Sequence, residues 1–324
     1  MTRPETDQVF LTEPEGYSEL ALQHYRCAGE VIRAGTPEES RLRPQDVTVL
    51  VIRLGHFIDS TFLGRFPRLR FIVSPTTGLN HLDHAASAMR GIEIISLKGE
   101  AAFLDSVTAT SELALGLMLA LHRRIPAAHH SVTADLAWNR DLFCSRMLSR
   151  MTAGLIGLGR LGRQMTRMCY GLGMRVIAYD PHVSDYDFAT TGAVRVSLED
   201  LAAQSDVISV HVDYRRENDG MINAAFLSRC HAGTLLVNTA RGELCDEEAL
   251  AAALDSGTLG GLATDVLRDE QSGAVLAEHP FVKRARRGMN ILITPHLGGC
   301  CADAMRETEE FAARKLLTRL ESAA

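Results

Sequence analysis

Short apolar runs rich in β-branched residues alternate with amphipathic segments of helical length, and this alternation limits the possible folds more than any other feature of the sequence. Near-continuous apolar strands separated by helices are typical of a parallel sheet covered on both faces. We therefore expect an α/β protein. In the second half of the chain, strands are predicted at Ala153–Gly157, Met174–Tyr179, Asp206–His211, Thr234–Asn238, Gly260–Asp265 and Asn290–Thr294.

The first hundred residues repeat the pattern more weakly, and 324 residues are too many for one ordinary hydrophobic core. The sequence predicts a long helix from about Ser111 and a terminal helix at Ala302–Ser322. We expect two domains, a discontinuous one of residues 1–104 and 299–324 and a larger one of residues 105–298. Strands of the first domain are predicted at Val9–Leu11, Val47–Ile52, Leu69–Val73 and Ile92–Ile95.

Composition argues against several classes of protein. Lys and Arg number 34 against 40 Asp and Glu, and a general nucleic-acid binder usually carries a basic excess. The longest apolar run, Leu113–Leu121, is about half as long as a membrane span requires. The seven cysteines have no CxxC spacing, and no leader-like segment is recognised. A cytoplasmic protein with reduced thiols and without a metal site is the expectation.

The strongest single motif is the run Gly157-Leu158-Gly159-Arg160-Leu161-Gly162, which follows an apolar strand and opens a helix. A tight turn at Gly157, close approach of a pyrophosphate at Gly159 and close helix–strand packing at Gly162 all require glycine. The exposed N–H groups and the helix dipole favour an anion at this place. The sequence therefore predicts a dinucleotide-binding loop.

An acidic residue supports this interpretation. Asp180 ends the next predicted strand, close to the position where a carboxylate accepts hydrogen bonds from the ribose hydroxyls of a dinucleotide. A carboxylate there would repel a 2′-phosphate, so NAD is predicted rather than NADP. The alternative is that Asp180 only begins a loop before Pro181.

These motifs and several others resemble the D-isomer-specific 2-hydroxyacid dehydrogenases, the phosphoglycerate dehydrogenases among them. The resemblance extends from about Val47 to Gly299, most of the chain. It implies a Rossmann nucleotide domain and a smaller flavodoxin-like substrate domain that flank a cleft. The matching segments are the glycine loop, residues 237–242 (VNTARG), residues 263–266 (ATDV) with Glu270, residues 294–299 (TPHLGG), residues 77–83 (TGLNHLD), and Trp138-Asn139-Arg140 with Phe143.

The resemblance implies three catalytic residues, each suited to the reduction of a 2-oxo acid. Arg241 carries a planar fork that can hold carboxylate and carbonyl oxygens together. His296 can protonate the developing alkoxide, or take the proton in oxidation. Glu270 would hydrogen-bond His296 and fix its ring, as carboxylates do in hydrolytic triads. Taken alone, Arg241 could cap a helix, and His296 could be a buried structural histidine. Glu270 could be solvated surface charge, and Asp269 offers a neighbouring carboxylate.

The resemblance also implies residues that bind the cofactor and the substrate. The main-chain N–H groups of Thr77 and Gly78 would hold the substrate carboxylate. Arg53 matches a position where some members of the family place a cation, and Lys98 could add a second. If both face the cleft, the substrate carries a further anionic group, such as phosphate, phosphonate or carboxylate. The implied cofactor-binding residues are Gly157, Gly159, Arg160, Leu161, Gly162, Asp180, His211, Val212, Thr239, Ala240, Asp265 and Gly298.

The segment Ile125–Met151 fits neither a strand nor a regular helix of the α/β pattern, and it contains Trp138, the only tryptophan. We interpret it as a projecting arm and expect a homodimer. The predicted activity is NAD(H)-dependent interconversion of a 2-oxo acid and a D-2-hydroxy acid. Two alternatives remain, an NAD-sensing interaction protein resembling corepressors of this fold, and an NADPH-linked glyoxylate or hydroxypyruvate reductase.

Overall fold

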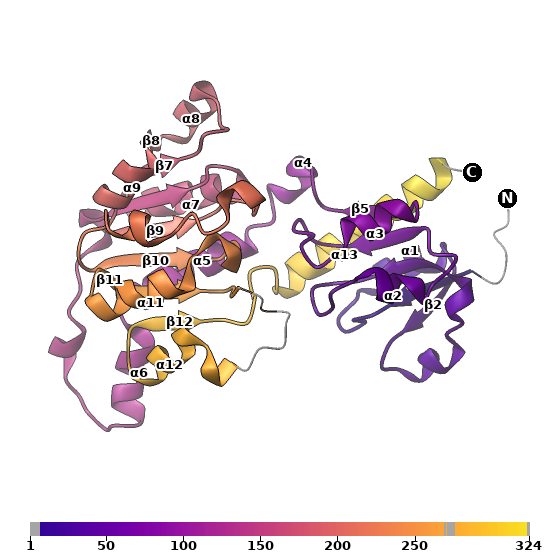
Figure 1. Ribbon diagram of the computed structural model, residues 1–324, viewed down its shortest axis with the longest axis horizontal. Coiled ribbons are helices and arrows are strands. Elements are labelled where there is room, and N and C mark those ends of the chain that lie inside the picture. Colours follow the sequence, from indigo (N-terminus) through magenta and orange to yellow (C-terminus); the bar gives the residue numbers. More distant parts are fainter. Residues whose placement is uncertain (1–6, 269, 271–275, 323–324) are drawn as a thin grey trace. The chain divides into compact units, whose positions relative to one another are not determined.

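The computed structural model describes residues 7–268, 270 and 276–322, which form two compact units. The first consists of the described residues of Met1–Val107 and Cys301–Ala324, and the second is built from Thr108–Cys300. Each unit contains one parallel sheet (Figure 1). The functional roles expected for the two units stay predictions at this point.

The sheet of the first unit has, among the described residues, five parallel strands in the order β2-β1-β3-β4-β5. Because β1 lies between β2 and β3, the strand order reverses at β1, as it does in flavodoxin-like folds. The strands are β1 (Gln8–Leu11), β2 (Glu30–Arg33), β3 (Val47–Val51), β4 (Phe71–Ser74) and β5 (Glu93–Ser96).

Helices cover both faces of this sheet. On one face, α1 (Glu19–Arg26) and α13 (Ala302–Ser322) pack together (Figure 1). The core beneath them includes Leu11 and Leu316. On the other face, α2 (Ser60–Gly64) contributes Leu63 to a second core. The remaining helices of the unit are α3 (His84–Met89) and α4 (Ala101–Leu104), with short 3-10 turns at Pro37–Arg41 and Pro44–Asp46.

The sheet of the second unit has, in the part of the chain that is described, seven parallel strands in the order β12-β11-β10-β9-β6-β7-β8. Its order reverses between β6 and β9, the place where a doubly wound sheet binds a nucleotide. The strands are β6 (Thr152–Ile156), β7 (Arg175–Tyr179), β8 (Val194–Arg195), β9 (Val207–Val210), β10 (Thr234–Asn238), β11 (Leu259–Thr264) and β12 (Ile291–Ile293).

Two apolar cores sandwich this second sheet. One includes Leu117 and Met165 from the helices α5 and α7, and the other includes Leu201 and Leu250 from α9 and α11. The helices of the unit are α5 (Ala109–His122), α6 (Ile125–Thr133), α7 (Arg160–Gly171), α8 (Asp185–Thr191), α9 (Leu198–Gln204), α10 (Ala224–Leu227), α11 (Glu247–Ser256) and α12 (Pro280–Arg286).

The predicted fold class, two doubly wound parallel sheets, is confirmed. One expectation about the segment Ile125–Met151 was wrong, because its first part forms the regular helix α6, with a proline in the first turn. Proline suits that position, where its missing N–H group costs no helical hydrogen bond. No helix in the described parts of the chain combines the length and the hydrophobicity of a membrane span.

Candidate active site

The glycine loop joins β6 to α7 at the carboxyl end of the second sheet. Gly157 has φ +96°, and a Cβ there would lie 2.8 Å from the carbonyl oxygen of His211. A Cβ at Gly162 would lie 2.1 Å from the carbonyl oxygen of Gly157. A Cβ at Gly159 would have no atom within 4 Å, so the chain leaves room at the middle glycine. This geometry fits a pyrophosphate in front of the first turn of α7, which contains Arg160 and Leu161.

Asp180 follows β7 and lies beside this loop. Its Oδ2 accepts a hydrogen bond of 2.8 Å from the N–H of Leu158, and its Oδ1 accepts one of 2.9 Å from the N–H of His182. The carboxylate therefore holds the glycine loop in shape. It is half-buried, which leaves part of it accessible to a ribose.

Further predicted cofactor residues follow β9 and β10. The His211 ring is buried, and its Nε2 lies 2.9 Å from Oγ of Ser209. Burial lowers the pKa of His211 to about 4, so this ring is neutral at pH 7 and adds no cation. Val212 lies next to Gly157. The buried hydroxyl of Thr239 has no hydrogen-bond partner among the described residues, as expected of a group that awaits a ligand.

Arg241 lies in a tight turn after β10 that Asn238 holds in place. The side-chain amide of Asn238 donates to the Arg241 carbonyl at 2.9 Å, and its oxygen accepts from the N–H of Ala240 at 2.9 Å. The Arg241 side chain is half-buried, and its Nη1 donates to the Ala240 carbonyl at 2.6 Å. Burial lowers the pKa of Arg241, and the charges of Glu270 and Glu243 oppose that shift.

The loop after β12 carries His296 in the left-handed region, with φ 55°. A non-glycine residue in such a conformation costs roughly 1–3 kcal/mol unless its surroundings enforce it. Asp265, which is buried directly after β11, holds the loop in this conformation. Its carboxylate accepts from Oγ1 of Thr294 at 2.5 Å and from the N–H groups of Leu297 and Gly298 at 2.7 and 2.8 Å. The cofactor contact of Asp265 stays a prediction.

His296 and Glu270 form a hydrogen-bonded pair. The Nδ1 atom of His296 lies 2.5 Å from Oε1 of Glu270, while Oε2 of Glu270 accepts from the N–H of Leu267 at 3.2 Å. Burial alone would raise the pKa of Glu270, but its interactions with His296, Leu267 and Arg241 together lower it. Glu270 is therefore an anion that holds one nitrogen of His296 and leaves the other for proton exchange. The alternative carboxylate, Asp269, lies outside the described residues.

The predicted substrate residues of the first unit lie after β3 and β4. The N–H groups of Thr77 and Gly78 donate no hydrogen bond to any described residue, so both are available for a carboxylate. Oγ1 of Thr76 stabilises this turn by donating to the Gly78 carbonyl at 2.8 Å. Arg53 forms an ion pair with Glu309 of α13. Lys98 is exposed.

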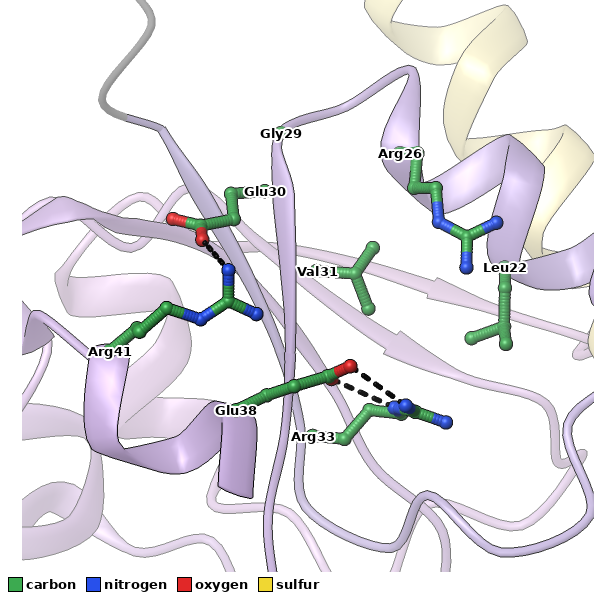
Figure 2. Close-up of a pocket in the computed structure, with 8 residues that line it drawn as sticks. All are labelled: Leu22, Arg26, Gly29, Glu30, Val31, Arg33, Glu38 and Arg41. Carbon is green, nitrogen blue, oxygen red and sulfur yellow. Dashed lines mark hydrogen bonds and ion pairs between the residues drawn. The ribbon is translucent and has the colours of Figure 1, made fainter. Parts of the chain in front are cut away.

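An open pocket elsewhere on the first unit, between α1, β2 and the turn Pro37–Arg41, is a weaker candidate (Figure 2). Three arginines line it, but Arg33 pairs with Glu38, Arg41 with Glu30, and Arg26 with Glu19. The cations are thus already compensated. The pocket also lies beside the outer edge of the sheet, away from the strand order reversal where open α/β sheets bind ligands.

Two family profiles match the chain. Residues 9–194 match the catalytic domain of the D-isomer specific 2-hydroxyacid dehydrogenases, and residues 115–298 match the NAD binding domain of that family. The chain belongs to the D-isomer-specific 2-hydroxyacid dehydrogenase family. The resemblance seen in the motifs is thereby confirmed, and the second unit contains the NAD-binding domain of this family member.

Curated relatives of this family member are named D-3-phosphoglycerate dehydrogenase. The one from Mycobacterium tuberculosis is 33% identical over 259 residues, which cover 80% of this chain and 46% of the relative. The one from Archaeoglobus fulgidus is 33% identical over 300 residues, 92% of this chain and 54% of the relative. The chain thus spans about half the length of the curated relatives it matches.

Solved structures show the same fold. The apo structure of D-lactate dehydrogenase from Escherichia coli has a TM-score of 0.81 at 25% identity and covers 98% of this chain and 97% of its own. The D-lactate dehydrogenase from Aquifex aeolicus, solved with NAD and lactic acid, has a TM-score of 0.81 at 24% identity, over 98% of this chain and 96% of that one.

Sequence reasoning missed some residues that shape these sites. It did not foresee that the carboxylate of Asp265, a predicted cofactor residue, also shapes the loop that carries His296. It did not single out Glu309, which is 256 residues from its partner Arg53. The signal available in the sequence was an acidic residue at helical spacing from the apolar residues Ala312, Ala313 and Leu316 of the predicted helix Ala302–Ser322.

Proposed function

We propose that the protein transfers a hydride between NAD(H) and a small 2-oxo acid or the matching D-2-hydroxy acid. The observation that carries this proposal is the His296–Glu270 pair, which lies in the same unit as Arg241 and the glycine loop. The chain spans about half the length of the curated relatives, and the proposal therefore rests on the residues of the site. Catalytic roles are proposed for Arg241, Glu270 and His296.

The residues at the carboxyl end of the second sheet fit a dinucleotide. A pyrophosphate fits the open space at Gly159 and the N-terminus of α7. The unpartnered Thr239 hydroxyl is a further group that can bind the dinucleotide. Bound there, NAD(H) supplies the hydride acceptor or donor. Asp180 is proposed to bind the ribose hydroxyls and to select NAD over NADP.

The chain's own groups then supply the rest of the chemistry. Arg241 binds the carboxylate and polarises the carbonyl oxygen, because its half-buried cation is strengthened by a low local dielectric. As the carbonyl carbon is reduced, the imidazolium of His296 gives its proton to the oxygen, and the neutral imidazole takes it back in oxidation. Glu270 keeps the ring oriented and stabilises its protonated form.

Within the first unit, the N–H groups of Thr77 and Gly78 are proposed to bind the substrate carboxylate. The free donors after β4 support this role. If Arg53 and Lys98 both face the cleft, a second anionic group on the substrate is expected, as in the phosphorylated acid named for the relatives, and otherwise both are ordinary surface cations. The ion pair between Arg53 and Glu309 speaks against that expectation.

A panel of 2-oxo acids with and without a second anionic group tests the proposal, with NADH absorbance as the signal. Oxidation of NADH that depends on one or more of the acids supports it. If NADH binds but no acid is reduced, the chain acts as an NAD-sensing interaction protein. If only NADPH is oxidised, the protein is better explained as an NADPH-linked glyoxylate or hydroxypyruvate reductase, and the proposed NAD(H)-dependent activity is wrong.

Asp180→Asn is expected to narrow the preference for NADH over NADPH by at least about tenfold, since the charge that repels a 2′-phosphate is gone. The single oxygen of asparagine can accept only one of the two hydrogen bonds that Asp180 accepts, and the bond from Leu158 is the one that keeps the glycine loop in shape. Calorimetric titration with both cofactors measures the change. Equal affinity of the unchanged protein for NADH and NADPH would refute the assignment of Asp180.

The arm is proposed to bind a second copy of the chain. Leu136 is 86% and Trp138 90% exposed, and Leu142 and Met147 add further exposed apolar surface. The double change Leu136→Ser and Trp138→Ser is expected to convert a dimer into a monomer in sedimentation velocity. Tyr186→Ser, at an exposed aromatic outside the arm, is the control and should stay dimeric. A monomeric unchanged protein at micromolar concentration would contradict the proposal.

A further inference from the structure

The topology of the first unit predicts a ligand-binding position. The strand order reverses at β1, and the connections after β1 and β3 lead to opposite faces, to α1 and α2 respectively. In open α/β sheets, ligands bind outside the carboxyl ends of the strands at such a reversal. The residues at this position in the chain are Glu13, shortly after β1, and Arg53, shortly after β3.

A carboxylate of the chain itself binds the main chain at this position. Oε2 of Glu13 accepts a hydrogen bond of 2.7 Å from the N–H of Arg53, and its Oε1 accepts one of 2.7 Å from the N–H of Gly55. A Cβ at Gly55 would lie 2.4 Å from Oε1 of Glu13, so a larger residue there would displace the end of the Glu13 side chain. Glu13 thus uses the two N–H groups that an anionic ligand would otherwise find here.

A second carboxylate neutralises the Arg53 side chain. The guanidinium pairs with Glu309 of α13 and lies 4.5 Å from the centre of the Tyr17 ring. The Glu309 side chain is 1% exposed and that of Arg53 is 18% exposed, so water screens the pair weakly. Burial raises the pKa of Glu309 to about 7, although the charge of Arg53 opposes this.

The buried atoms left over at this position also indicate the kind of group that it takes. Oε2 of Glu309 and Nε of Arg53 are both buried, and neither has a hydrogen-bond partner among the described residues. The carboxylate oxygen accepts and the guanidinium N–H donates, so a neutral group that does both, such as a hydroxyl or an amide, suits this pair of atoms. A phosphate or a second carboxylate would instead meet Glu13 and Glu309 together, and like charges repel.

We propose that Glu13 and Glu309 neutralise Arg53, so that the first unit selects acids whose side chain is uncharged or donates hydrogen bonds and rejects acids that carry a second anionic group. This inference rests on the proposed function for the identity of the ligand as a 2-oxo acid. The neutralisation of Arg53 itself rests only on the contacts around it.

The test uses the full chain with Glu13→Gln, Glu309→Gln and both changes together, at about pH 8, where Glu309 is ionised. Glu38→Gln is the matched control, because it also removes a carboxylate paired with an arginine of the first unit. Thermal unfolding establishes that each variant is folded. If Glu309→Gln does not fold, the Glu13→Gln variant alone tests the inference. Glu13 is only half-buried, so its replacement is expected to leave the protein folded.

The first measurement is calorimetric titration of inorganic phosphate without substrate. The double variant is expected to bind phosphate at least about tenfold more tightly than the unchanged protein and the Glu38→Gln control. The second is the ratio of kcat/KM for an uncharged 2-oxo acid to that for a phosphorylated one. The unchanged protein should favour the uncharged acid, and the double variant should reduce that ratio by at least about tenfold.

The outcomes separate this inference from the proposed function. If no acid is reduced by the unchanged protein, the proposed function fails, and the phosphate titration still tests the neutralisation of Arg53. If the unchanged protein prefers the phosphorylated acid, or if neither the phosphate affinity nor the ratio changes in the variants, the inference is overturned.

Discussion

His296→Asn is expected to lower turnover by at least about a hundredfold, the typical contribution of a positioned proton donor. Asparagine tolerates the left-handed backbone that His296 adopts, so the variant loses the imidazole without adding strain. The measurement is kcat for reduction of the best 2-oxo acid, with NADH affinity measured in parallel. NADH affinity should change little, because the role assigned to His296 is proton transfer.

His231→Gln is the control for this experiment. His231 lies just before β10, at the opposite end of that strand from Arg241, and it is also partly exposed. Its replacement should leave turnover close to that of the unchanged protein. Near-normal turnover of a folded His296→Asn variant would remove His296 from the mechanism and leave the pair with Glu270 as a structural contact.

Gly162→Ala is expected to weaken NADH binding by at least about tenfold, because the new Cβ would lie 2.1 Å from the carbonyl oxygen of Gly157. Such an overlap with main-chain atoms cannot be relieved unless the glycine loop moves. Gly159→Ala should weaken NADH binding without a change in thermal stability, because the protein leaves that Cβ free and only the pyrophosphate needs the space. Titration of NADH and thermal unfolding measure the two effects.

Gly171→Ala, at the last residue of the same helix, provides the comparison. A Cβ at Gly171 would have no atom within 4 Å, and this position is far along the helix from the glycine loop. Its affinity for NADH should match that of the unchanged protein. If Gly162→Ala and Gly159→Ala bind NADH as tightly as Gly171→Ala and the unchanged protein do, the glycine loop does not bind the cofactor.

The sequence predicts most of the fold because buried parallel strands consist of nearly continuous apolar runs, which are easy to recognise. The six strands expected in the second half are all present, and so is the terminal helix Ala302–Ser322. The strand β2 was not predicted, because it is an edge strand whose sequence EVIR has charged residues at both ends. Charged residues are common in edge strands, where they prevent pairing with the strands of other chains. They also interrupt the apolar run by which a strand is predicted.

The candidate site was predictable where its residues directly follow strands. Arg241 and His296 belong to short motifs at strand ends, and parallel strands bring their carboxyl ends to one edge of the sheet. The partners of Arg53 were not predictable. Glu13 and Glu309 lie 40 and 256 residues away from it, in segments without a motif, and only the packing of α13 on the sheet reveals their contact.

The configuration of the product tests the central claim most directly. The protein is incubated with NADH and the 2-oxo acid that it reduces best, and the hydroxy acid is resolved by chiral chromatography. The account predicts the D-2-hydroxy acid, formed in an amount equal to the NADH oxidised. Formation of the L-isomer, or no hydroxy acid from any 2-oxo acid that is offered, would contradict it.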